Sequence, residues 1–346
     1  MKLTIFGLTI SSSWGNGHAT PYRAILKALR RLGHQISFYE KDTDYYARRR
    51  DFERCSYCDL VLYRNWNEVR ARALAEAAVS DEVLELSGPL RVFYDLDTPI
   101  TLRNLEFGTV PYLRAEQMPA WDLYLSFTGG GILDELESRW DVRLARPLYG
   151  CVDPDVHGRV APRDDFQCEL SYMGTYAADR QEKVDRFFLE PARRNPEARF
   201  TLAGSLYPPH WQWPANVRLF EHVAPSDHPA LYSSSRLTLN VTRDGMARFG
   251  HCPSGRFFEA AACGTPLVTD WWNGLEAFFD DDELFVAHNS DHVLEALSAT
   301  DEELQRVARR ARQRTLEEHT GLRRAEQLLG YLEEAGQHRN RAHAAA

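Results

Sequence analysis

An alternation of strand-like and helical segments runs through this chain twice, and it constrains the fold more than any other feature. Short apolar segments with strand composition occur in the first half at 3–10, 35–39, 60–63, 90–95 and 123–127, with a helical segment at 71–85. The pattern restarts with strands at 168–173, 199–203, 217–220, 236–241, 266–270 and 284–287, and helices at 179–189, 227–234, 254–263 and 301–335. Such alternation predicts an α/β fold whose parallel sheets are covered by helices on both faces.

The boundary between the two halves falls at 147–165, where proline, glycine and aspartate cluster. We therefore predict two Rossmann-like domains, residues 1–155 and 165–330, that face a central cleft. Ligands of such sheets bind outside the carboxyl ends of the strands, so both domains would contribute to one site. Residues 337–346 have no apolar face and are predicted to form a disordered tail.

Composition excludes some functions. The formal charge of −9 argues against a large nucleic-acid interface, which needs a basic face. No apolar run reaches the roughly 18 residues of a membrane span, and the N-terminal segment is better interpreted as a strand than as a signal peptide. The six cysteines suggest reduced thiols and a cytoplasmic location. Cys55 and Cys58 form a single CxxC pair, which is too few ligands for a structural zinc site, so we predict no metal.

The segment 254–263 carries the clearest chemical signal. Ser254 is placed to cap a helix that Gly255 opens, and the helix N-terminus with the guanidinium of Arg256 suits a phosphate group. Glu259 lies one turn further in, where its carboxylate could accept hydrogen bonds from the two hydroxyls of a ribose. The alternative is an Arg–Glu pair on a solvated face, but the residues around Glu259 leave little polar face: Phe257, Phe258, Ala260, Ala261 and Ala262.

These residues resemble the donor-binding signature of glycosyltransferases of the GT-B fold, in particular the CgeB-like group. The resemblance covers most of 165–330 and rests on Asn-Val-Thr-Arg at 240–243, Arg-Phe-Phe-Glu-Ala-Ala-Ala-Cys-Gly at 256–264, Thr-Asp at 269–270, Gly-Leu at 274–275 and His-Thr at 319–320. It implies that Glu259 binds the donor ribose, that Gly174, Thr175 and Arg180 lie near the diphosphate, and that Arg243 flanks the nucleobase. It does not distinguish UDP, GDP and dTDP.

One position departs from the family pattern. Many retaining enzymes of this fold have a second glutamate, separated by seven residues from the ribose-binding one, that contacts the donor sugar. The equivalent position in this chain is His251. The imidazole could hydrogen-bond the sugar or a phosphate instead, so retention and inversion of the anomeric configuration both stay open.

Acceptor-side candidates come from the first half. The loop 11–18 contains Gly15, Asn16 and Gly17 before His18, and it resembles the first-strand loop that faces the acceptor in several GT-B enzymes. His18 is a candidate general base, with a capping or structural histidine as the alternative. Asp95 and Asp97, at the end of a strand, would orient His18 or take the acceptor proton. Alternatively they form a strand-end turn, or the Asp-x-Asp metal motif of the GT-A fold.

A triple glycine around Gly130 allows a substrate or the other domain to approach closely. The combined prediction is a glycosyltransferase that moves a sugar from a nucleotide-diphosphate sugar to an acceptor hydroxyl. No cofactor is predicted. The acceptor is a small molecule, a polysaccharide or a protein. Positive charge and helix dipoles, rather than a metal, would stabilise the departing diphosphate. Two alternatives are a nucleotide-sugar epimerase of the same fold and a non-catalytic nucleotide-sugar-binding protein.

Overall fold

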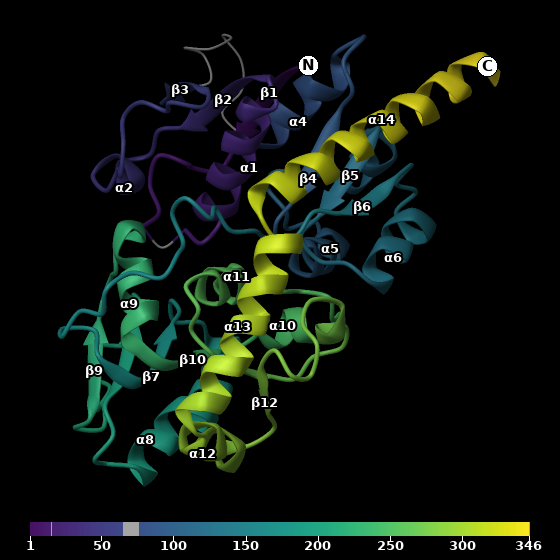
Figure 1. The fold of residues 1–346 in the computed structure, drawn as a ribbon. Helices are drawn as coiled ribbons and strands as arrows, with labels where there is room; N and C mark the ends of the chain where they lie inside the picture. Colours follow the sequence, from purple (N-terminus) through teal and green to yellow (C-terminus); the bar gives the residue numbers. More distant parts are fainter. Residues whose placement is uncertain (15, 65–75, 346) are drawn as a thin grey trace.

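The N-terminal half contains two three-stranded parallel sheets, in the orders β1-β2-β3 and β4-β5-β6 (Figure 1). The structure is a computed structural model that describes residues 1–14, 16–64 and 76–345. The strands are β1 Lys2–Gly7, β2 Gln35–Lys41, β3 Asp59–Tyr63, β4 Val92–Asp95, β5 Leu123–Ser126 and β6 Ala145–Pro147. The helices are α1 Ala19–Arg31, α2 Asp44–Ala47, α4 Glu76–Glu85, α5 Thr98–Glu106, the 3-10 turn Ala115–Ala120 and α6 Gly131–Arg139. Residues 71–75 of one predicted helix lie outside the described residues.

The two N-terminal sheets share one hydrophobic core. Phe38 from β2 and Leu123 and Leu125 from β5 belong to the same buried cluster, together with Ile25 and Leu29 of α1. Alternate residues of β2 are buried, as expected for a strand with one face on the core. The core therefore positions the loops that follow β1, β4 and β5 at one end of this half.

The C-terminal half contains one six-stranded parallel sheet in the order β12-β11-β10-β7-β8-β9. Its strands are β7 Cys168–Met173, β8 Phe200–Ala203, β9 Val217–Phe220, β10 Ser235–Asn240, β11 Leu267–Asp270 and β12 Phe285–Ala287. The first strand, β7, pairs directly with the fourth, β10, so the chain winds outward to both edges. The gap between β7 and β10 is a topological switch point, where open α/β sheets bind ligands. The predicted α/β class with parallel sheets is confirmed.

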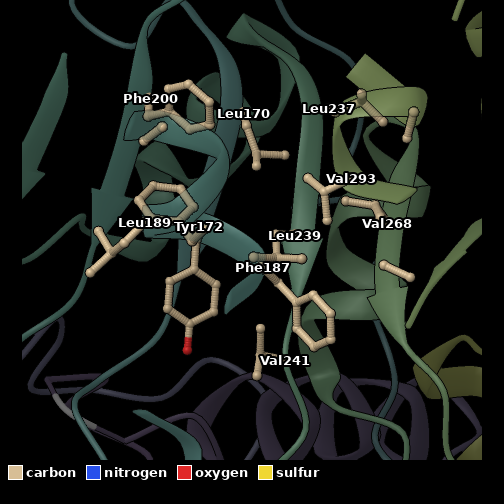
Figure 2. Packing of buried hydrophobic residues seen from close by; sticks show 14 of the residues in the cluster. Leu170, Tyr172, Phe187, Leu189, Phe200, Leu237, Leu239, Val241, Val268 and Val293 are labelled. Carbon is tan, nitrogen blue, oxygen red and sulfur yellow. The ribbon is translucent and has the colours of Figure 1, made fainter. Parts of the chain in front are cut away.

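Helices cover this sheet on both faces. They are α7 Ala178–Val184, a π-helical turn Asp185–Leu189, α8 Glu190–Arg194, α9 His228–Ser234, α10 Asp244–Ala247, α11 Gly255–Ala262 and α12 Ser290–Ser298, with 3-10 turns at Pro225–Asp227 and Leu275–Ala277. Figure 2 shows the buried cluster under this sheet, in which Phe187 of the π-helical turn lies beside Leu239 of β10 and Leu170 and Leu237 lie further along the central strands. This cluster joins the sheet to the helices that cover it.

The predicted helix 301–335 is in fact two helices, α13 Asp301–Glu318 and α14 Gly321–Ala345. They separate because His319 and Gly321 hydrogen-bond Val152 of the interdomain connection: Val152 N donates to His319 O at 3.0 Å, and Gly321 N donates to Val152 O at 2.9 Å. Helix α13 lies on the C-terminal half, whereas α14 crosses back and packs on α1 (Figure 1).

Residues 337–346 were predicted to form a disordered tail. In the structure, α14 continues to Ala345, so the described part of this segment is helical. Arg339 holds this last part of the helix by donating to the carbonyl oxygens of Gly88 and Pro89 at 2.8 and 2.7 Å. No local pattern in the sequence indicates these long-range hydrogen bonds. Within the described residues, no helix combines the length and apolarity needed to cross a bilayer.

Candidate active site

The loop after β7 lies at the switch point of the C-terminal sheet and requires glycine. A Cβ on Gly174 would lie 2.4 Å from the hydroxyl of Tyr172 and 2.8 Å from Nη1 of Arg256, and a Cβ on Gly204 would lie 2.0 Å from the Gly174 carbonyl oxygen. Arg256 donates to the carbonyl of Met173, directly before this loop. The structure thus brings together Gly174 and Arg256, which the sequence placed near the same diphosphate.

Two guanidinium groups at this loop have no carboxylate partner. Arg180, which is 6% exposed, donates to the Thr175 carbonyl, and Arg256 donates to Met173 O and to the Ser254 hydroxyl at 3.1 Å. In the part of the chain that the structure describes, neither forms an ion pair. Burial lowers the pKa of Arg180, and the charge of Arg256 lowers it further. Two close guanidinium groups that form no ion pair favour an anionic ligand.

The other basic residues nearby are already paired. Arg243 donates from Nε to the carboxylate of Asp179 at 3.0 Å, so its charge is balanced. Lys183 forms ion pairs with Asp244 at 2.9 Å and Asp270 at 3.0 Å. Among these basic residues of the described structure, Arg180 and Arg256 are the ones that form no ion pair.

The helix α11 begins at Gly255, as the sequence predicted. Ser254 occupies the N-cap position, but in the described structure its hydroxyl makes no cap hydrogen bond and instead accepts from Arg256. The predicted N-cap position of Ser254 is therefore confirmed, but the side-chain hydrogen bond that a capping serine usually makes does not form among the described residues. The Ser254 hydroxyl instead positions Arg256, and the described N-terminus of α11 has no side-chain cap.

Glu259 is buried with two histidines that sequence analysis did not find. It is 5% exposed, and its Oε2 lies 3.2 Å from Nδ1 of His228 and 3.9 Å from Nε2 of His157. Burial raises the pKa of Glu259, but the hydrogen bond to His228 and the charge of nearby basic groups outweigh it and lower the pKa to about 2. The alternative of a solvated Arg–Glu pair is wrong, since the carboxylate is buried and is an anion.

His251 lies where the two halves meet, with a backbone φ of +44°. Its amide donates to Asn273 O at 2.8 Å, and its carbonyl accepts from Gly129 N at 3.0 Å. Its ring is so close to Gly130 and Gly274 that added Cβ atoms would meet it at 2.6 and 2.4 Å. Gly130, predicted for the acceptor side, therefore contacts the other half of the chain.

A buried carboxylate organises the loop after β1. The hydroxyl of Thr9 and the hydroxyl of Ser11 each donate to Oε1 of Glu40 at 2.5 Å. The amides of Ile10 and Ser11 donate to Oε2 of the same carboxylate at 2.7 and 2.9 Å. Glu40 is 1% exposed. No local sequence pattern indicates this role of Glu40, because Glu40 lies near the end of the neighbouring strand, 29 to 31 positions from the residues that it binds.

The remainder of this loop leads to His18. The side-chain amide of Asn16 donates to Thr9 O at 2.7 Å, and its oxygen accepts from the His18 amide at 3.2 Å. Gly17 is exposed, and among the described atoms none lies within 4 Å of where its Cβ would be. Gly15, which was predicted as part of the loop, lies outside the described residues.

His18 and the two aspartates have different environments. Burial lowers the pKa of His18, and the nearby carboxylate of Asp97 partly opposes this shift. Asp95 accepts from Tyr124 Oη at 2.7 Å, Thr101 Oγ1 at 3.0 Å and the Asp97 amide at 3.1 Å. Asp97 is thus placed to act on His18, whereas Asp95 is occupied in shaping the turn between β4 and α5.

The two halves also touch through an aromatic pair. The ring of Trp14, in the loop after β1, lies 4.2 Å between centroids from the ring of His222, which follows β9. Arg49 covers Trp14 at 4.5 Å. The loop that carries Trp14 and His18 is therefore held against the segment that follows β9.

Comparison with known proteins gives a family match in the C-terminal half. The sequence profile described as glycosyl transferase-like matches residues 180–330. No curated protein matches the sequence significantly.

Solved structures of similar fold cover nearly the whole chain. An α-glucosyltransferase in complex with UDP-glucose and DNA containing an abasic site has a TM-score of 0.71 and 12% identity, covering 96% of this chain and 99% of that one. HepE of Anabaena, in complex with UDP and glucose, has a TM-score of 0.65 and 10% identity, with coverages of 95% and 98%. The sucrose-phosphate synthase of Thermosynechococcus elongatus has a TM-score of 0.61 and 12% identity, with coverages of 99% and 100%.

Proposed function

We propose that this chain is a glycosyltransferase of the GT-B fold that transfers a sugar from a nucleotide-diphosphate sugar to an acceptor hydroxyl. The observation that carries the donor class is the pair Arg180 and Arg256, which lie beside the Gly174 loop without a carboxylate partner. A diphosphate supplies the missing negative charge, and two guanidinium groups can bind its oxygens in a bidentate manner. The family match favours transfer over the epimerase and the non-catalytic binding protein.

The remaining donor contacts follow from this position. The N-terminus of α11, at Gly255, adds the positive end of a helix dipole to the diphosphate site. Glu259, one turn into the helix and ionised, accepts hydrogen bonds from the ribose hydroxyls. Arg243, paired with Asp179, flanks the nucleobase. The two guanidinium groups stabilise the charge that develops on the leaving diphosphate, with no metal required.

The acceptor lies against the N-terminal half, near the loop after β1. His18 is the proposed base, because burial lowers its pKa and keeps the imidazole neutral, which is the form that accepts a proton. Asp97 stabilises the imidazolium after proton transfer. His251 and Gly130 close the site between the halves. The net charge of −9 argues against a nucleic-acid acceptor. We further propose that the chain belongs to the CgeB-like group and acts in the cytoplasm.

Titration of the purified protein with UDP, GDP and dTDP by isothermal calorimetry tests the donor site. We expect one of these to bind, and Arg180→Gln and Arg256→Gln each to weaken it by about 10- to 150-fold, since a hydrogen bond to a charged group contributes about 1.5–3 kcal/mol. Arg186→Gln is the matched control, because Arg186 is exposed and, among the described residues, forms its ion pair with Glu182 alone. The proposal fails if no nucleoside diphosphate binds, or if Arg180→Gln binds as tightly as Arg186→Gln.

A further inference from the structure

Three potential metal ligands meet in the C-terminal half. His157 lies in the turn after β6, His228 is the first residue of α9, and Glu259 lies in α11. One ligand atom from each residue lies within 4.8 Å of the others. Three separate elements therefore bring two imidazoles and one carboxylate to a single point.

His157 has polar atoms that nothing in the described structure satisfies. It is 3% exposed, and neither Nδ1 nor Nε2 has a hydrogen-bond partner among the described residues. A buried unsatisfied polar group costs about 1–3 kcal/mol, so such a group calls for a ligand. The ring faces Glu259, with 3.9 Å between Nε2 and Oε2.

The second imidazole has the environment of a metal-bound histidine. Nε2 of His228 lies 3.3 Å from the carbonyl oxygen of Val223, while Nδ1 lies 3.2 Å from Oε2 of Glu259. Metal ligands of this type usually donate the other ring N–H to a backbone carbonyl, which fixes the ring and directs a lone pair at the ion. In the tautomer that carries its proton on Nε2, the ring donates to Val223 and directs the lone pair of Nδ1 at a carboxylate oxygen. Two acceptors that face each other at 3.2 Å share a cation, which is a proton in the hydrogen-bonded form described above and a metal ion in the form proposed next.

We propose that His157, His228 and Glu259 bind one divalent transition-metal ion of the Zn²⁺ class. Two imidazoles and a carboxylate are a ligand set that Zn²⁺ accepts, with a fourth position left for water, whereas Mg²⁺ and Ca²⁺ prefer oxygen ligands. Tetrahedral bonds of about 2.1 Å place ligand atoms about 3.4 Å apart. Glu259 lies 3.2 Å from His228 and 3.9 Å from His157, and all three ligand atoms lie within 4.8 Å of one another. His157 can close the remaining distance because its ring has no hydrogen bond to break.

The ion would share Glu259 with the proposed donor site, where this residue binds the ribose. Competition between the ion and the nucleotide therefore rests on the proposed function. A carboxylate bound to Zn²⁺ is a weaker acceptor for ribose hydroxyls, so bound Zn²⁺ competes with the nucleotide. His228 keeps 14% of its side chain exposed and provides the entry side for the ion.

Metal binding is measured on the metal-free full chain, without nucleotide, by competition with a chromophoric chelator. We expect one equivalent of Zn²⁺ on these ligands, and His157→Ala and His228→Ala each to weaken it by at least 100-fold. His210→Ala, which changes an exposed histidine, leaves it unchanged. Co²⁺ in place of Zn²⁺ gives visible d–d bands without a thiolate charge-transfer band, and both histidine variants lose those bands.

Two outcomes overturn the site. The first is the absence of Zn²⁺ binding in the wild type. The second is binding that survives in both histidine variants but disappears in Cys55→Ser/Cys58→Ser, which would place the ion on the CxxC pair. His157→Gln is the second variant if His157→Ala does not fold, and a Zn²⁺-dependent rise of the wild-type Tm gives an independent readout. Zn²⁺ binding by a protein that binds no nucleotide would keep the site and refute the proposed function instead.

Discussion

Gly130 of the N-terminal half lies directly against the imidazole ring of His251 in the C-terminal half. A Cβ on Gly130 would meet Nδ1 at 2.6 Å, and the φ of +67° is unfavourable for any other residue. We expect Gly130→Ala to cost about 2–5 kcal/mol in the free energy of unfolding, from backbone strain and overpacking. Urea denaturation measures this.

Two variants separate the clash from the strain at Gly130. Gly131→Ala is the matched control, because no described atom lies within 4 Å of its added Cβ and its φ is ordinary. Gly130→Ala combined with His251→Ala should recover part of the loss, because only the strain remains. An equal loss at both glycines would contradict the contact with His251.

The loop after β1 depends on Glu40, which accepts four hydrogen bonds from Thr9, Ile10 and Ser11. Glu40→Gln places an amide where two donors point, and we expect a loss of about 2–4 kcal/mol in the free energy of unfolding. Hydrogen exchange of the Ile10 and Ser11 amides should accelerate. Glu53→Gln, at an exposed position, is the control and should change neither quantity.

Asp95 makes stability depend on pH in an unusual direction. Burial raises its pKa from 3.8 to about 6, and the hydrogen bonds it accepts only partly oppose this. The folded protein therefore holds the proton more tightly than the unfolded chain. The resulting stabilisation is complete below pH 3.8 and is lost as the pH rises through 6, by about 3 kcal/mol in total.

The Asn variant isolates this effect. We expect the wild type to lose stability relative to Asp95→Asn between pH 4.5 and 7.5 in urea denaturation, because groups other than Asp95 titrate alike in both proteins. Parallel stability curves over this range would show that Asp95 has an ordinary pKa.

His18 should titrate below its ordinary pKa of 6.5, because burial disfavours the imidazolium and Asp97 only partly compensates. Replacing Asp97 by Asn removes the compensating charge, so the pKa of His18 should fall further. NMR titration measures it, with the resonance assigned by its absence in His18→Gln. A rise of the pKa in Asp97→Asn would mean that Asp97 does not act on His18.

Much of the fold could be predicted from local patterns. The strand β7 was predicted with its bounds, because a short apolar run between turn residues is typical of a buried strand. The division of the last helical segment was missed because its cause is not local: residues 319 and 321 bond to Val152. Helical periodicity continues on both sides of that break, so the sequence shows one helix where tertiary contacts make two.

The same distinction holds for the candidate site. Glu259 and Arg256 could be found because they share one helix with a glycine at its start and apolar neighbours. His157 and His228 could not, since they lie 102 and 31 positions from Glu259 and have no local motif. Only the packing of three separate elements shows that they surround the same carboxylate.

The return of α14 to the N-terminal half affects how the chain folds during synthesis. Ala325 and Leu328 of this helix complete the core that also contains Ile25 and Leu29 of α1. The ribosome produces α1 roughly 300 residues before α14, and domains usually fold in the order in which they are made. In this chain the core of the first half is incomplete until α14 has been made. We therefore expect a nascent chain that stops near residue 320 to expose the hydrophobic face of α1 that α14 covers. Chaperone capture would therefore be strongest for translation products that end before α14.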